Sequence, residues 1–331
     1  MNPIVRYTSR EIAELLESDD ELPDFGSRLF NMKNIFLTLN NIQTHIITWG
    51  DPCHCNEADV IICISGNPGI SDFYTTFGSL LHENTKLPVC VIGQAGHEEV
   101  PDKQSNELKG QEHLFNLEGQ IQHKLDLISE YINKDSKLHL IGHSIGSWLI
   151  LEMLEKNENI IERVSSVNLL FPTVQRMAES KSGIFLNNFI RRAHALLMIL
   201  CMLLYIIPES VKRIIVSLYL KFNGIPLHFD ASLIKFFNHK VIEKVLFLAY
   251  NEMDRVNTLN IGSIEKIKDR TNVLYGSRDG WVPLHYMEDM KQFEPAITLR
   301  KVDIDHAFVL KSSPIIADIV SDFVKKKITH T

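Results

Sequence analysis

Five consecutive residues, Gly142-His143-Ser144-Ile145-Gly146, form the G-x-S-x-G pattern in which a serine can act as a nucleophile. An apolar run of strand length precedes them and a helical pattern follows. In that context a sharp turn exposes the serine, and Gly142 and Gly146 let strand and helix pass close together. Free N–H groups at the helix start stabilise developing negative charge. We therefore predict that Ser144 is a nucleophile; the alternative is an ordinary glycine-rich turn.

A serine hydroxyl reacts readily only when a histidine takes its proton and an acid orients that histidine. In nucleophile-elbow folds the three residues occur in the order serine, acid, histidine. Asp279 and His306 each follow a predicted strand, so we expect both to meet Ser144 at one edge of the sheet. The alternatives are a solvated turn aspartate and a surface histidine. Asp254 is a reserve acid, and His143 is expected to pack beside the nucleophile.

Acyl transfer also requires two donors directed at the oxygen of the tetrahedral intermediate. We expect the first to be the backbone N–H of Ile145. The second is expected from residues 65–69, Ser-Gly-Asn-Pro-Gly, and we assign it to the N–H of Asn67. Gly66 and Gly69 suit the close backbone approach that this role requires. A plain β-turn is the alternative for this segment.

Strand-like and helix-like stretches alternate along most of the chain. The first two strand-like runs flank Asn40-Asn41 and predict a hairpin. Later runs are apolar without alternation, as in strands covered on both faces. We therefore predict a mostly parallel sheet with helices on both faces, extended by the antiparallel hairpin. The expected strands are 35–39, 44–49, 59–64, 88–92, the run before Gly142, 164–171, 272–276 and 297–302, and the main helices are 72–83, 109–132, the stretch after Ser144, and 312–325.

This order of elements divides the chain into three parts. Residues 1–30 are predicted to be an N-terminal extension, and residues 31–172 and 271–331 an α/β core. The intervening residues 173–270 are predicted to be a helical cap inserted over the carboxyl ends of the strands, where such folds bind ligands.

Composition and charge argue against several functions. The net charge of −7 and the lack of a nucleic-acid motif give no reason to expect a nucleic-acid partner. Cys53-His54-Cys55 could suggest a metal, but no second ligand pair accompanies it, so we expect no metal. The odd number of cysteines and the lack of an apolar N-terminal run suggest reduced thiols and a cytosol-facing protein.

Taken together, these motifs resemble the α/β-hydrolase superfamily and, within it, the lipid droplet-associated hydrolases. The combination of residues 66–69 with residues 142–146 is the more specific part of the likeness, which runs from about residue 34 to the C-terminus. One residue departs from the wider superfamily: Ser65 stands where many members have a histidine, which bears on how firmly the loop is held. The segments that carry the resemblance are 65–69, 96–97, 142–146, 276–279 and 305–306.

The resemblance implies a serine hydrolase with Ser144 as nucleophile, Asp279 as acid and His306 as base, and without a metal or organic cofactor. It also implies a location on the lipid droplet and on the cytosolic face of the endoplasmic reticulum, with neutral lipid esters, notably sterol esters, as candidate substrates. A non-catalytic or weakly catalytic droplet-surface protein and an acyltransferase that uses the same residues remain alternatives.

One stretch of the predicted cap, residues 195–207, contains no charge. As a helix it would be about 20 Å long, shorter than the ~30 Å hydrocarbon core of a bilayer, so no ordinary membrane span is expected. Because the stretch has no polar face, either the rest of the insertion buries it or it enters a leaflet or droplet monolayer, with Arg191 and Arg192 at the headgroups. The family resemblance favours monolayer association through residues 191–222.

Overall fold

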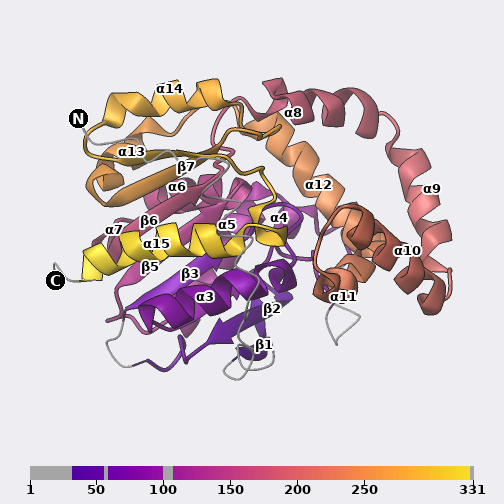
Figure 1. Cartoon of the computed structure of the whole chain (residues 1–331), viewed down its shortest axis with the longest axis horizontal. Coiled ribbons are helices and arrows are strands. Elements are labelled where there is room, and N and C mark those ends of the chain that lie inside the picture. The colour runs from indigo at the N-terminus through magenta and orange to yellow at the C-terminus, as the bar shows by residue number, and fades with distance from the viewer. Residues whose placement is uncertain (1–31, 56–58, 100–106, 329–331) are drawn as a thin grey trace.

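The computed structural model describes residues 32–55, 59–99 and 107–328 (Figure 1). The predicted extension, residues 1–30, lies outside the described residues. Eight strands in the described chain form a single sheet in the order β1-β2-β4-β3-β5-β6-β7-β8. Their bounds are β1 Met32–Leu39, β2 Ile42–Trp49, β3 Val60–Ile64, β4 Val89–Ile92, β5 Leu138–His143, β6 Val164–Leu170, β7 Thr271–Gly276 and β8 Thr298–Val302.

The opening hairpin and the parallel pairs agree with the sequence-based prediction. Asn40 and Asn41 both have left-handed backbones, with φ of 48° and 60°, as the two central residues of a type I′ turn require. Asparagine tolerates this conformation better than most residues, so the pair fixes Leu39 opposite Ile42. The β1–β2 and β2–β4 pairs are antiparallel, whereas the remaining neighbouring strands run parallel.

The central strands are apolar throughout because both faces of the sheet are covered. On β3, Ile62 and Ile64 face one hydrophobic cluster while Ile61 and Cys63 face the other. Helices α5 (Leu117–Asp126), α6 (Ile145–Lys156) and α13 (Ile261–Ile267) complete the first cluster, and α3 (Thr75–Thr85) and α15 (Ser313–Ile328) the second. Figure 1 shows α3 and α15 side by side across the near face.

The single helix predicted over residues 109–132 is wrong, because the chain is broken there. It forms α4 (Glu112–Phe115), then α5, then a π turn, η2 (Leu127–Tyr131). Asn116 has an extended backbone at the break, and its side-chain Oδ1 accepts the N–H of Gly119 at 2.8 Å. A side chain that caps the next helix in this way competes with continuation of the previous one.

Between β6 and β7 the chain forms a helical insertion (Figure 1). Helix α12 (His239–Arg255) packs against α9 (His194–Tyr205) and also against α4 and α5. The elements of four or more residues in the insertion are α8 (Lys181–Phe185), η4 (Leu186–Ile190), α9 (His194–Tyr205), α10 (Glu209–Phe222), α11 (Asp230–Ile234) and α12 (His239–Arg255), with α13 at its end. Within residues 32–55, 59–99 and 107–328, the remaining helices of four or more residues are η1 (Ser71–Tyr74), α7 (Glu158–Arg163) and α14 (Met287–Met290).

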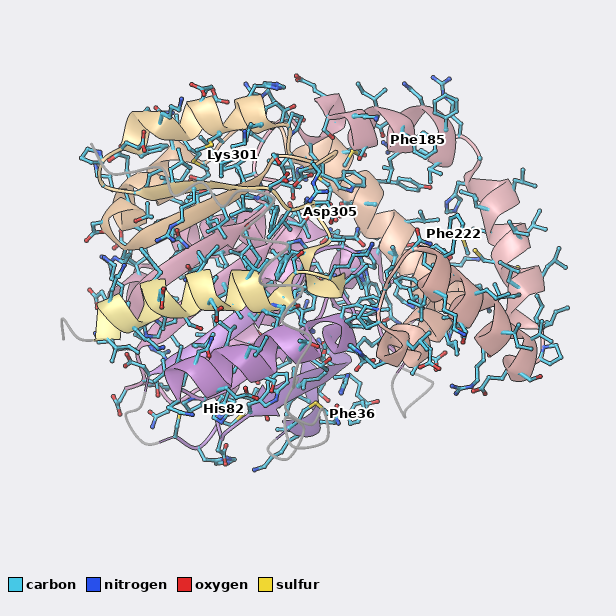
Figure 2. All side chains as sticks on the ribbon, in the orientation of Figure 1. Phe36, His82, Phe185, Phe222, Lys301 and Asp305 are labelled. Carbon is cyan, nitrogen blue, oxygen red and sulfur yellow. The ribbon has the colours of Figure 1, made fainter. Side chains whose placement is uncertain are left out.

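Helix α9 contains no buried residue, although nearly all of its side chains are apolar. Leu196 is 69% exposed, and on α10 Phe222 is 91% exposed. The alternative in which the insertion buries this apolar stretch is therefore wrong. Figure 2 labels Phe185 and Phe222, two of the exposed aromatic side chains. Among the described residues no single helix is long and apolar enough to cross a bilayer, whereas Lys181–Ile190 and His194–Tyr205 satisfy that requirement as a pair bent by 84°.

Candidate active site

Ser144 lies at the tight turn between β5 and α6. Its φ of 54° and ψ of −122° are unusual for a residue with a side chain, and such backbone strain is concentrated at functional sites. A Cβ on Gly142 would lie 2.6 Å from the Ser147 nitrogen, and a Cβ on Gly146 would overlap the Ile64 carbonyl oxygen. The two glycines are therefore needed for strand and helix to approach this closely.

The structure brings Ser144 and His306 together, although 162 residues separate them in the sequence. His306 follows β8, in the loop that Asp305 marks in Figure 2. Its Nε2 lies 2.8 Å from Ser144 Oγ and its Nδ1 lies 2.7 Å from Asp279 Oδ2. Because a carboxylate only accepts hydrogen bonds, Nδ1–H donates to Asp279, and Nε2 is left to accept the serine hydroxyl proton.

Asp279 is held in place by the turn that follows β7. Its side chain is fully buried, and Oδ1 accepts the N–H groups of Trp281 at 2.7 Å and Val282 at 2.9 Å. Oδ2 is therefore directed at His306. The reserve acid Asp254 lies elsewhere, on the exposed side of α12, where it forms a bidentate ion pair with Arg191 at 2.7 Å. The alternative assignment of Asp254 is wrong.

His143 packs beside the nucleophile, as predicted, and joins two loops. Its Nε2 lies 2.9 Å from the backbone oxygen of His306, a group that only accepts, so Nε2 carries the proton. Its Nδ1 then accepts the Tyr74 hydroxyl at 2.6 Å, and that hydroxyl accepts the N–H of Gly66 at 2.8 Å. Burial lowers the pKa of His143 well below its usual value, which keeps the ring neutral.

The loop of residues 65–69 is fixed from behind by buried side chains. Ser65, at the position where a histidine is common in the superfamily, accepts Gln94 Nε2 at its carbonyl oxygen at 2.7 Å. The N–H of Gly69 donates to His97 Nδ1 at 3.0 Å. Burial lowers the pKa of His97 to about 3, so the ring stays a neutral acceptor. Gln94 and His97 thus secure a loop whose own Ser65 hydroxyl has no hydrogen-bond partner among the described residues.

The Asn67 side chain contacts the insertion. Its Nδ2 donates to Glu252 Oε1 at 2.8 Å and to the Val245 carbonyl oxygen at 3.2 Å. Glu252 is 1% exposed, and burial raises the pKa of its carboxyl to about 8, although the hydrogen bond from Asn67 opposes that rise. Neither Glu252 nor Tyr74 was identified from the sequence, because no motif or spacing connects them with Ser144.

Two groups of possible metal ligands have other partners. His45, Asp72 and Glu98 place ligand atoms within 4.8 Å of one another, but Lys235 Nζ contacts both carboxylates, and its distance to Glu98 is 3.2 Å. The ammonium group thus supplies the positive charge that a cation would bring. In the Cys53-His54-Cys55 stretch neither thiol forms a disulfide, Cys55 Sγ donates to the Pro52 carbonyl oxygen at 3.5 Å, and His54 Nδ1 lies 3.0 Å from Asp51 Oδ1.

Comparison with known proteins places the chain in a family. The family model described as lipid-droplet associated hydrolase matches residues 57–309. The chain belongs to this family. The lipid droplet-associated hydrolase of Drosophila melanogaster is 40% identical over 304 residues, which cover 89% of this chain and 99% of that protein. The Homo sapiens protein of the same name is 31% identical over 312 residues, covering 88% and 94% of the two chains.

Solved structures share the fold at low sequence identity. A bacterial membrane phospholipase A aligns with a TM-score of 0.60 at 14% identity, covering 95% of this chain and 92% of that one. A thioesterase domain from the curacin pathway aligns with a TM-score of 0.58 at 14% identity, covering 87% and 99%. The predicted α/β-hydrolase fold and the predicted likeness to lipid droplet-associated hydrolases are confirmed, and both support the assignment as a hydrolase.

Proposed function

We propose that this member of the lipid droplet-associated hydrolase family is a serine esterase that hydrolyses lipid esters through an acyl-enzyme on Ser144. The observation that carries the proposal is the position of His306, whose two ring nitrogens lie 2.8 Å from the Ser144 hydroxyl and 2.7 Å from Asp279. Hydrogen-bond reach between nucleophile, base and acid is the geometry that this chemistry requires.

The proposed reaction has two halves. Ser144 Oγ attacks the ester carbonyl carbon while His306 Nε2 takes the hydroxyl proton, and Asp279 stabilises the imidazolium that forms. The tetrahedral intermediate collapses, and the alcohol leaves with the proton from His306. Water then gives a proton to His306 and attacks the acyl-enzyme, so the carboxylic acid departs and Ser144 regains its proton.

We assign the oxyanion donors to the backbone N–H groups of Asn67 and Ile145. Ile145 is the first residue of α6, so its N–H has no partner within the helix. In the 65–69 loop the N–H groups of Gly66 and Gly69 donate to Tyr74 and His97, and Pro68 has none. These hydrogen bonds support the backbone N–H of Asn67 as the donor that is still available to a substrate oxygen.

We further propose that the core comprises residues 31–172 and 271–331, and that the cap, residues 173–270, binds the droplet monolayer or the cytosolic face of the endoplasmic reticulum through about residues 191–222. The exposed apolar side chains of α9 and α10 support this, as do flanking Arg191, Arg192 and Lys212. The names of the relatives indicate droplet association for those proteins. An enzyme at that surface meets neutral lipid esters, and sterol esters are the candidate substrates.

Activity-based labelling tests the proposal directly. A fluorophosphonate probe is expected to label the wild-type protein and not Ser144→Ala. A panel of lipid esters, assayed with and without an acceptor alcohol, then separates hydrolysis from acyl transfer. Absence of labelling in a folded wild-type protein would instead support a non-catalytic droplet protein.

A further inference from the structure

The proposed oxyanion loop is held from the front by a helix of the insertion. Both hydrogens of the Asn67 amide point to α12, one to Glu252 Oε1 at 2.8 Å and one to the Val245 carbonyl oxygen at 3.2 Å. A carbonyl oxygen only accepts, so Val245 fixes which end of the amide faces the helix. Asn67 Oδ1 is buried without a hydrogen-bond partner in the described part of the chain. Leaving that atom unpaired is costly, so the amide is held there against a penalty.

Glu252 occupies a buried site, where an apolar side chain would cost less free energy to bury than a carboxyl group. Its side chain is almost fully buried, and a buried carboxyl is tolerated only when it is neutral or hydrogen-bonded. Asn67 Nδ2 is its hydrogen-bond donor among the described residues. A contribution to folding alone gives no reason to keep a carboxyl here, whereas a role in holding the Asn67 backbone does.

The same helix also contacts the first residue of the exposed apolar helix α9 and the segment just before it. Tyr250 Oη lies 3.2 Å from His194 Nδ1, and Asp254 pairs with Arg191. Glu252 lies between these two positions in the sequence, and Figure 1 shows α12 running between α9 and the core. A shift of α9 would therefore be transmitted through α12 to the loop that carries Asn67.

We propose that Glu252 is a positioning residue for the oxyanion loop: it acts through the Asn67 side chain, so that the placement of α12 sets the geometry of the donor. The inference rests on the serine esterase function proposed above. A donor displaced by about 1 Å can cost on the order of 100-fold in rate, and this loss falls on kcat because the interaction forms in the transition state.

The test compares Glu252→Ala, Glu252→Gln and the control Glu243→Ala, which removes a half-buried carboxylate from the same helix. On a soluble short-chain ester, Glu252→Ala is expected to lower kcat by about 10- to 100-fold with KM within about 2-fold. Glu252→Gln keeps an acceptor for Asn67 Nδ2 and is expected to restore kcat, and Glu243→Ala is expected to match wild type. If Glu252→Ala does not fold, Glu252→Met, which keeps the volume without the acceptor, replaces it.

A double-mutant cycle separates positioning from a general structural effect. If Glu252 acts through Asn67, the Glu252→Ala change is expected to lower kcat no further in an Asn67→Ala background. Multiplicative losses, or an unchanged kcat in Glu252→Ala, would overturn the inference while probe labelling of wild type leaves the esterase proposal intact. Failure of the folded wild-type protein to label would overturn both.

Discussion

The sheet edge around Ser144 and the helix pair α9–α10 present opposite physical situations. At the sheet edge polar side chains are buried, and Asp279, fully enclosed, has hydrogen bonds on both oxygens. On α9 and α10 apolar side chains such as Leu196 and Phe222 are exposed. Buried polar groups are stable once they are paired, whereas a large exposed apolar surface indicates a binding partner. In the first region the partners lie within the protein, whereas for the second we propose a lipid surface as the partner.

The largest effect is expected for Ser144→Ala, which tests whether ester hydrolysis and droplet binding depend on separate regions. Loss of the nucleophile should reduce ester hydrolysis by about 10⁵- to 10⁶-fold, measured with a soluble ester. Binding to phospholipid-coated triolein droplets should be unchanged, because α9 and α10 are untouched. A variant that lost droplet binding as well would show that the two regions are not independent.

Asp279→Asn is expected to lower kcat by about 10⁴-fold without unfolding the protein. The amide keeps an oxygen that can accept the Trp281 and Val282 N–H groups, but its NH₂ group would then face His306 Nδ1 and favour the wrong tautomer. Steady-state kinetics and a thermal melt measure the two effects. The matched change Asp254→Asn should leave kcat within about 2-fold, and an equal loss there would restore Asp254 as a candidate acid.

A charge on α9 tests the proposed binding of this helix to a lipid surface. Leu196→Glu should weaken binding to the same droplets by about 10-fold or more, because one buried leucine contributes about 1.5–3 kcal/mol. Hydrolysis of a soluble ester should change by less than about 2-fold. The control Ile261→Glu places a charge on an exposed apolar residue of α13, and equal weakening there would argue against a specific surface on α9.

A smaller effect is expected from pH, through Glu252. Its folded-state pKa of about 8 lies above the ordinary value of 4.5, so the neutral form stabilises the fold fully below about pH 4.5, and this stabilisation is lost as pH rises through 8. Glu252→Gln removes this dependence, so its melting temperature relative to wild type should rise by several degrees between pH 5 and 8. A difference that does not vary with pH would show that Glu252 titrates normally.

The features that the sequence predicted well depend on local rules. A strand, a glycine-flanked serine and a helix are contiguous, and Asn40-Asn41 specifies its own turn. Asp279 and His306 could be predicted because parallel strands end at one edge of the sheet. Tyr74 and Glu252 could not, since their hydrogen bonds join distant segments that follow no spacing rule.

Two further predictions concerned features that sequence patterns alone do not determine. Hydrophobic periodicity continued across residue 116, but the local cap formed by Asn116 interrupts the helix there. The apolar composition of residues 195–207 was clear, whereas its surroundings were not, because a run without a polar face fits a protein core and a lipid phase equally well. Only the placement of neighbouring helices distinguishes the two.

Because His143 is neutral, it places no positive charge beside His306. Its ring centre lies 5.2 Å from that of His306, close enough for two imidazolium ions to repel each other strongly. His143 accepts a hydrogen bond from the Tyr74 hydroxyl at Nδ1 and donates one from Nε2 to a carbonyl oxygen, so the lone pair on Nδ1 is already engaged. In the proposed reaction the positive charge that develops on His306 therefore faces the Asp279 carboxyl group and not a second cation.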